Sequence, residues 1–265
     1  MPPSSPSIPR HRGRISTRQM IGLSGGVVLV ALFGLLARGP ALERAVSAGD
    51  VRAVAILLRL GASPDYVGVA WRPVLHVALW NSQTDIVRLL LEHRANPNLR
   101  DPSGSTALHV AAMMNNAEAA RMLLDYGADP DARRAETLEG RGMTPLHFAI
   151  QAGDEDFVKV MLEHGADVTA EISNNKPCLV VAAEHGQVEI LKLLLQAPDA
   201  ADHDTVSRAL IAAVRHGYVP AVELLLKHGA DPGYAIEHGE TALIVAQRAG
   251  RPDLTKLLTA RQAKR

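Results

Sequence analysis

The sequence has few aromatic residues and almost no cysteine. Only 3% of its 265 residues are Phe, Trp or Tyr, and Cys178 is the single cysteine. A core of Leu, Val, Ile and Ala with so few rings suits closely stacked short helices better than a β-sandwich, whose strands use β-branched and aromatic residues. One cysteine excludes an intrachain disulfide. We interpret Cys178 as a buried helix residue, with a reactive or intermolecularly paired thiol as the alternative.

The chain also lacks an excess of either charge, with 28 basic and 28 acidic residues. The distribution is nevertheless uneven, because residues 1–38 contain five arginines and no acidic residue. Without those five, 23 basic and 28 acidic residues remain from Gly39 onward, a net charge of −5. A domain of that sign repels phosphate backbones, so we expect no nucleic-acid partner.

The first forty residues divide into a polar and an apolar segment. Residues 1–19 are rich in Pro, Ser and Arg, which predicts a disordered, basic N-terminus. Residues 20–37 read MIGLSGGVVLVALFGLLA and contain no charge. As a helix this run is roughly 27 Å long, close to the ~30 Å hydrocarbon core of a bilayer. We therefore predict a single transmembrane signal-anchor helix over residues 20–37.

Two other interpretations of this run stay open: a cleaved signal peptide, which would release a secreted domain, and a buried helix of the soluble domain. Four arginines precede the run and one follows it, which favours an N-terminus in the cytoplasm. The rest of the chain would then lie on the extracytoplasmic side, which in a bacterium is the periplasm.

From residue 40 to residue 265 the chain repeats itself. Two segments are near copies, TALHVAA from Thr106 and TPLHFAI from Thr144. Weaker copies begin at Pro40, Pro73, Pro177, Arg208 and Thr241, so that successive units start 33, 33, 38, 33, 31 and 33 residues apart. About seven units in one register predict a repeat architecture.

Each unit contains the signals of two short antiparallel helices. A Thr or Pro starts the first helix, and a turn residue follows nine positions later: Gly49, Ser82, Asn115, Gly153, Gly186, Gly217 or Gly250. An apolar run then ends in a stop such as the Gly-Ala-Asp-Pro at Gly127. The residues beyond the stop are predicted to form a hairpin-like finger that leads to the next unit.

These units closely resemble the ankyrin-repeat family, whose unit carries the TPLHxA signature. The resemblance covers residues 40–265 and implies an all-α ankyrin-repeat solenoid, here preceded by a single transmembrane helix. It also implies a protein-interaction scaffold, without naming the partner. Two regions depart from the pattern: the segment from Ala132 to Met143 has five extra residues, and the fifth unit has Pro198 at its stop and a finger two residues short.

Most of the eleven histidines fall at equivalent positions of the units. His76, His109 and His147 occupy the signature position, where the ring should hydrogen-bond the backbone of the adjoining finger. His93, His164 and His228 lie near the ends of second helices. The sequence contains no H-E-x-x-H, cysteine pair, phosphate loop or nucleophile elbow. We therefore predict no catalytic residue, no metal site and no cofactor, and a protein that is not an enzyme.

Two sets of positions in such a solenoid do not pack in the core. They are the fingertips and the two residues before each inter-helix turn, which line the concave face. Trp is enriched among binding hot spots, and Met adapts to irregular partners. The N-terminal half of this face is apolar and the C-terminal half is polar and ionisable. The predicted partner-binding residues are Tyr66, Trp71, Trp80, Asn81, Met113, Met114, Gln151, His185, Arg215 and His216. In the alternative interpretation, both tryptophans fill gaps between units.

The sequence thus favours a membrane-anchored scaffold or adaptor that binds another protein, itself membrane-bound or membrane-proximal. An inhibitor or immunity-type protein that sequesters its target could use the same surface. Only three residues, Arg38 to Pro40, separate the apolar run from the first unit. Partner identity and oligomeric state are not encoded in any pattern we find.

Overall fold

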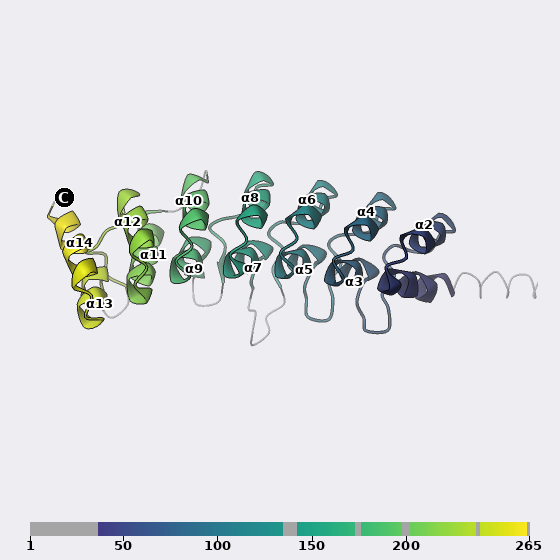
Figure 1. Ribbon diagram of the computed structural model, residues 1–265, viewed down its shortest axis with the longest axis horizontal. Coiled ribbons are helices and arrows are strands. Elements are labelled where there is room, and N and C mark those ends of the chain that lie inside the picture. The colour runs from purple at the N-terminus through teal and green to yellow at the C-terminus, as the bar shows by residue number, and fades with distance from the viewer. Residues whose placement is uncertain (1–36, 135–141, 173–175, 198–201, 237–238, 264–265) are drawn as a thin grey trace, which may run out of the picture.

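The computed structural model describes residues 37–134, 142–172, 176–197, 202–236 and 239–263. Their helices stack as pairs in two rows, and fingers project from the inner row (Figure 1). The inner row consists of a first helix (residues 37–48), α3 (Val74–Trp80), α5 (Ala107–Met113), α7 (Pro145–Ala152), α9 (Cys178–Glu184), α11 (His203–His216) and α13 (Ala242–Arg248). The outer row consists of α2 (Val51–Arg59), α4 (Thr84–Glu92), α6 (Ala117–Asp125), α8 (Glu155–Glu163), α10 (Val188–Gln196), α12 (Val219–Lys227) and α14 (Pro252–Gln262). The predicted all-α solenoid is confirmed.

Local sequence explains where the helices begin and end. Asp50, Asn116 and Asp154 cap outer helices, since each side chain accepts a hydrogen bond from a backbone N–H three residues later. Every predicted inter-helix turn has a residue with positive φ, including Ser82 at 55° and Asn115 at 52° in place of glycine. The nine-residue spacing therefore identified the turns correctly, even where glycine is missing.

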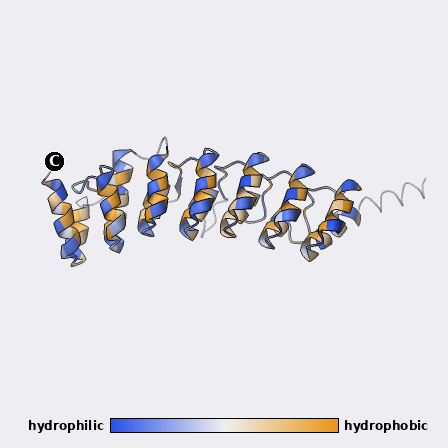
Figure 2. Cartoon of the chain, turned by 45° about the horizontal axis from the view of Figure 1, so that its top comes forward, coloured by the Kyte–Doolittle hydropathy of each residue, from blue (hydrophilic) through white to orange (hydrophobic). Residues whose placement is uncertain are grey.

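The core lies between the two rows and between neighbouring pairs, as the apolar faces in Figure 2 indicate. Its largest fully buried side chains include Phe157, Leu108 and Ile150. Cys178 is also fully buried, and burial raises the pKa of its thiol to about 12. The thiol is therefore protonated at neutral pH, in agreement with the interpretation of Cys178 as a buried helix residue.

Consecutive units are tied together by a ladder of side chain to backbone hydrogen bonds at the base of the fingers. The side chain of Asp65 accepts from Asn96 N at 2.7 Å, and that of Asn98 accepts from Asp129 N at 2.8 Å. The side chain of Asp131 continues the ladder, because it accepts from Asp167 N of the next unit at 2.8 Å. One finger also contains a short antiparallel pair, β1 (Glu171–Ile172) with β2 (Lys176–Pro177). Each unit thus contacts mainly its neighbours, as solenoids do.

The sixth unit differs from the prediction. Its first helix, α11, begins at His203 and not near Arg208, and it is 14 residues long against seven for α9. Asp202 caps this earlier start, because its carboxylate accepts from Thr205 N at 2.7 Å. No Gly or Pro interrupts the residues from His203 to His216. The helix thus takes over positions where a finger was expected, and Ser207 Oγ accepts the hydrogen bond from Asp231 N at 2.9 Å.

At the N-terminal end of the described chain, residues 37–48 form one helix, so Arg38, Gly39 and Pro40, which separate the apolar run from the first unit, are helical. The predicted disordered segment (residues 1–19) and residues 20–36 of the predicted transmembrane helix lie outside the described residues, as do residues 135–141 of the long finger. Within the described ranges, no helix combines the length and apolar character needed to cross a membrane.

Candidate protein-binding surface

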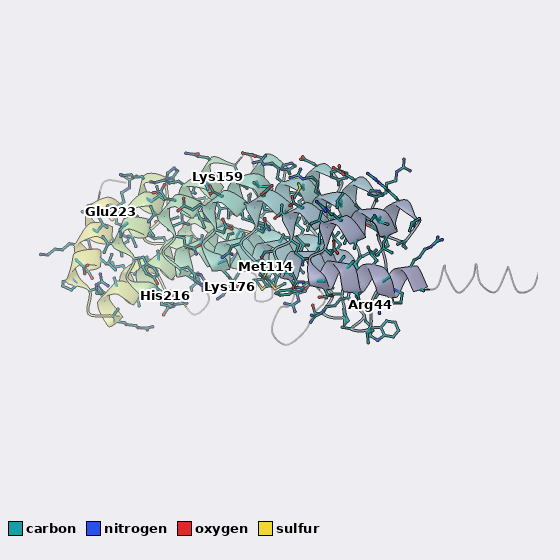
Figure 3. All side chains as sticks on the ribbon, turned by 45° about the vertical axis from the view of Figure 1, so that its right-hand side comes forward. Arg44, Met114, Lys159, Lys176, His216 and Glu223 are labelled. Atoms are coloured by element: carbon teal, nitrogen blue, oxygen red, sulfur yellow. The ribbon has the colours of Figure 1, made fainter. Side chains whose placement is uncertain are left out.

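The inner helices and the fingers share one side of the solenoid, which we call the inner face. It comprises the last residue or two of each inner helix, the helix C-cap residue and the adjoining finger. In Figure 3, Met114, Lys176 and His216 lie along this side, whereas Lys159 and Glu223 of the outer helices lie on the other. The array is gently arched, with its hollow side toward the fingers (Figure 1). The sequence-predicted residues fall on this face or on its first finger.

The N-terminal half of the inner face is apolar and partly exposed. Trp80 ends α3 and is 37% exposed, and Asn81 caps the same helix. Met113 ends α5 and Met114 caps it, and both are partly buried against the core. Trp80 itself is not among the residues packed into that core. A partly exposed indole, with thioethers at the equivalent position and the next one of the following unit, is a composition that suits a binding hot spot.

Behind the methionines lies an arrangement that the sequence did not lead us to expect. The ring of Phe148 meets His109 edge-on, with centroids 5.8 Å apart and an interplanar angle of 82°. The guanidinium of Arg134 lies 5.7 Å from the centroid of the same ring. Arg134 comes from the long finger and also donates to Ser103 O at 3.4 Å. Only the excess length of that finger hinted that one of its arginines could reach α7.

The C-terminal half of the inner face carries charges that are already paired. Glu240 accepts from Arg215 at 2.7 Å and from Arg248 at 3.2 Å, and Lys176 pairs with Glu184 at 2.7 Å. The sequence identified Arg215 but missed Glu240, because the finger that carries Glu240 folds back toward α11.

The other predicted residues of this half are exposed, and two of them have partners within the domain. Gln151 is exposed near the end of α7. His185 donates from Nδ1 to Val181 O at 2.9 Å, and His216 stacks on Tyr218 with ring centroids 6.1 Å apart. His185 and His216 are thus held in place before any partner binds.

The first finger places Tyr66 and Trp71 away from the helix ends. Tyr66 is partly buried, and its ring lies against Gly39 of the first helix. Trp71 is at the fingertip and is 77% exposed. Neither tryptophan belongs to the core, and no ring contact joins Trp71 to Trp80 among the described residues. Trp71 is thus exposed at a fingertip, whereas the gap-filling interpretation stays open for Trp80, whose side chain is 37% exposed.

The signature histidines have the structural role that their repetition predicted. Nε2 of His76 donates to Ser105 O at 3.0 Å, and Nε2 of His109 donates to Met143 O at 3.1 Å, each in the following finger. Nε2 of His147 instead lies 3.6 Å from Sγ of Cys178. Burial lowers the pKa of His109 and of His147 to about 4, so both rings are neutral at pH 7.

The histidines at the ends of outer helices serve as caps. Nδ1 of His93, His164 and His228 donates to the carbonyl oxygen four residues earlier, at 2.9, 2.9 and 3.0 Å. Across the described ranges, no three side chains of the His, Cys, Asp and Glu types are grouped as a metal site. The histidine pattern is therefore explained by hydrogen bonds within and between units.

Three hollows of the described surface are not lined by the predicted residues. One of about 500 Å³ lies between α8 and α10, lined by residues such as Leu162, Val168 and Leu193. Another of about 370 Å³ lies between α12 and α14, beside Glu223 and Arg261. A third, of about 430 Å³, lies at the turn between α13 and α14, beside Gln247 and Arg251. None of the three encloses the predicted residues, which lie on a surface that suits a macromolecule better than an enclosed small molecule.

Comparison with known proteins agrees with this geometry. A sequence profile described as ankyrin repeats in three copies matches residues 42–134, 133–207 and 179–264. The chain is similar to the ankyrin repeat domain of Bcl-3, described as a unique member of the IkappaB protein family. Their identity is 31% and the TM-score is 0.70, over 82% of this chain and 97% of that one. It is also similar to the human ASB11 ankyrin repeat domain, with 25% identity and a TM-score of 0.68 over 83% and 96% of the two chains. A search of curated proteins found no match.

The helix-pair solenoid with an open inner face defines a protein-interaction scaffold. The chain belongs to the ankyrin-repeat family. Repeats of this kind are binding scaffolds as a rule and not enzymes. The exact number of repeats and the start of each unit remain predictions.

Proposed function

We propose that this protein is a membrane-anchored scaffold that binds another protein through the N-terminal half of its inner face. The observation that carries the proposal is Trp80, an indole that is 37% exposed on a helix whose other apolar side chains are mostly buried. Tryptophan is enriched among the residues that dominate binding energy, and a partner that covers this indole gains the free energy of burying its apolar surface. Asn81, the next residue, is also exposed and supplies a hydrogen-bonding group beside it.

The membrane part of the proposal rests on the sequence of residues 20–37 and on the arginines around it. We expect carbonate washing to leave the full-length protein in the membrane fraction. A reporter that is active only outside the cytoplasm, fused after Arg265, should be active. A reporter that works only in the cytoplasm would reverse the orientation, and a shortened soluble product would establish a cleaved signal peptide.

The partner site can be located with a photo-crosslinking residue placed at position 80 in the full-length protein. The same residue at position 126 is a matched control, because Tyr126 is also an exposed aromatic but lies at the end of an outer helix. A protein crosslinked from position 80 and not from position 126 would be the partner. Equal crosslinking from both positions would contradict a site on the inner face.

Affinity for that partner then tests the role of Trp80. Trp80→Ala should weaken binding by about 2 kcal/mol, roughly thirtyfold in the dissociation constant. Tyr126→Ala should leave binding unchanged. The melting temperature of Trp80→Ala should stay close to that of the parent, because Trp80 is not part of the core. A collapsed melt would assign Trp80 to packing and not to recognition.

A further inference from the structure

The first two fingers follow the same backbone path, but the tip of the first is apolar and the tip of the second is polar. In the first finger, Gly68 N donates to Arg72 O and Trp71 N donates to Gly68 O. The equivalent residues of the second finger make the same two bonds: Asp101 N donates to Ser105 O, and Gly104 N donates to Asp101 O. The second tip is polar, because the Asp101 carboxylate accepts from Ser103 N, Ser103 Oγ and Ser105 N at 2.9, 2.6 and 3.0 Å. The first tip has glycine at the carboxylate position and carries Val67, Val69 and Trp71, which are 41, 90 and 77% exposed.

Trp71 occupies a position that favours glycine. Its φ is 55°, and it lies two positions before the unit that starts at Pro73. The same position in three other units is a glycine with positive φ: Gly104, Gly142 and Gly239. A bulky side chain in this region of φ is strained, so the tip would be more stable with glycine. The fold therefore gains nothing from this indole, and strained residues of this kind gather at functional sites.

The first finger is fixed against the first helix. A side chain at Gly39 would clash with the ring of Tyr66, so the ring must lie directly on the helix backbone. Gly68 makes a similarly close approach to the carboxylate of Glu43, which also accepts from Val69 N at 3.3 Å. These contacts hold the tip in one place relative to residues 39–43.

That helix directly continues the uncharged run of residues 20–37 and already includes Ala37. Gly39 is two residues past the end of the run, roughly 3 Å along a helix. Trp71 follows Tyr66 by five residues, so the two lie at most about 17 Å apart. The headgroup layer on each side of a bilayer is roughly 5–8 Å deep. Gly68, beside the tip, lies against Glu43, six residues past the end of the run and roughly 9 Å along the helix. If the run spans a membrane, this finger is therefore the one packed on the helix that leaves it.

The charge of this end suits an anionic surface. Residues 37–72 contain five arginines and three acidic residues, whereas the chain from Gly39 onward has a net charge of −5. Arg72, next to Trp71, is exposed, as is Arg44 on the first helix (Figure 3). Basic residues beside a bilayer are attracted to its anionic lipids, and indoles prefer its headgroup region.

We propose that the tip of the first finger, formed by Val67, Val69 and Trp71, inserts into the headgroup region of the membrane that anchors the chain. Insertion gives the domain a second attachment besides the anchor helix and fixes the direction in which the inner face points. This inference depends on the membrane anchoring proposed above, but it does not depend on the partner of Trp80.

The chain contains only two tryptophans, so each can be observed alone. Full-length protein carrying Trp80→Phe is reconstituted into vesicles of phosphatidylcholine and phosphatidylglycerol, with lipids brominated at shallow or deep acyl positions. We expect the emission of Trp71 to shift to shorter wavelength and to lose intensity with the shallow label, while acrylamide in the water quenches it poorly. In Trp71→Phe protein, Trp80 should be quenched by acrylamide and not by the lipids.

A second control places one tryptophan on the outer side, with Tyr126→Trp in a chain that also carries Trp71→Phe and Trp80→Phe. It should behave like Trp80. Trp71→Gly should remain folded and membrane-bound, which separates an effect on docking from an effect on folding.

Release of the parent protein by carbonate would overturn the anchoring itself. Retention in the membrane, together with full acrylamide quenching of Trp71, would overturn the inference alone. If Trp71 is shielded from acrylamide equally in vesicles and in detergent, without quenching by brominated lipid, then it packs against another part of this chain and the lipid proposal is wrong.

Discussion

The second and third helix pairs, each with the finger before it, differ at the tip and also at the base of the finger. In the third pair, Nδ1 of His109 accepts from Thr106 N at 3.2 Å and lies 2.8 Å from Thr106 Oγ1. In the second pair Pro73 replaces the threonine, and Nδ1 of His76 is buried without a partner. The same backbone thus tolerates the loss of the polar network at both ends of the finger. We expect the finger with the exposed indole to be the less stable of the two, because it lacks both polar networks and has a strained residue at its tip.

The largest effect we expect concerns the network in the third pair. His109 is buried and neutral, with its pKa lowered to about 4 from 6.5. Below pH 6.5 the His109 ring is protonated in the unfolded chain, whereas in the folded protein it stays neutral until the pH approaches 4. The stability that depends on the neutral ring is therefore complete above pH 6.5 and is lost as the pH falls toward 4. Between pH 7.5 and pH 5 the loss should be about 2 kcal/mol.

Urea unfolding of the full-length protein in a mild detergent, at several pH values, measures this loss. His109→Gln keeps a side chain that can cap the helix but cannot be protonated. Its free energy of unfolding should fall by about 2 kcal/mol less than that of the parent over the same range of pH. Parallel curves for the two proteins would mean that His109 is not a source of the pH dependence.

The next effect concerns the polar tip. Partial burial alone would raise the pKa of Asp101, but hydrogen bonds from Ser103 and Ser105 outweigh it and hold the pKa below its usual value. Asp101→Ala removes those bonds and should destabilise the protein by about 1.5 kcal/mol in the same unfolding measurement. Trp71→Gly on the first finger should have the opposite sign, because it relieves strain. If both substitutions destabilise the protein, the tip of the first finger is not strained and the proposed difference between the two fingers is wrong.

The smallest effect we expect comes from giving His76 of the second pair the cap that it lacks. Pro73→Thr supplies an N–H and a hydroxyl to Nδ1 of His76, as Thr106 does for His109. We expect a gain in stability of about 1 kcal/mol, reduced somewhat by the lost rigidity of proline. The reverse change, Thr106→Pro, should cost a similar amount. A Pro73→Thr protein that unfolds more easily than the parent would show that His76 obtains nothing from the new cap.

Much of the fold followed from spacing, because a turn residue nine positions after each unit start fixes where helices reverse, whichever residue stands there. Ser82 and Asn115 are examples, since both have the positive φ expected of glycine. The start of α11 could not be found this way. Its signal is an ordinary cap at Asp202 followed by residues that permit a helix, and this outweighed the repeat register.

The candidate surface was only partly predictable. Alignment of the units identified Trp80, Met113 and Arg215 as positions on the inner face, since equivalent positions share a location. It could not identify Glu240 or the contact of Arg134 with Phe148, because both depend on where a finger folds in space. The strain at Trp71 was equally hidden, although a tryptophan two positions before a unit start, where other units have glycine, was the available signal.

The paired charges of the C-terminal half have a kinetic consequence. Glu240 is held between Arg215 and Arg248, and Lys176 is held by Glu184, so these side chains leave only one positive charge uncompensated. Long-range attraction raises association rate constants far above the ~10⁵–10⁶ M⁻¹s⁻¹ of neutral surfaces only where such charge is available. Encounter at this face is therefore governed by diffusion and orientation, and its rate should change little with ionic strength. The membrane anchoring proposed above would compensate for the missing attraction, since a search restricted to the plane of a membrane raises the rate of encounter without any charge.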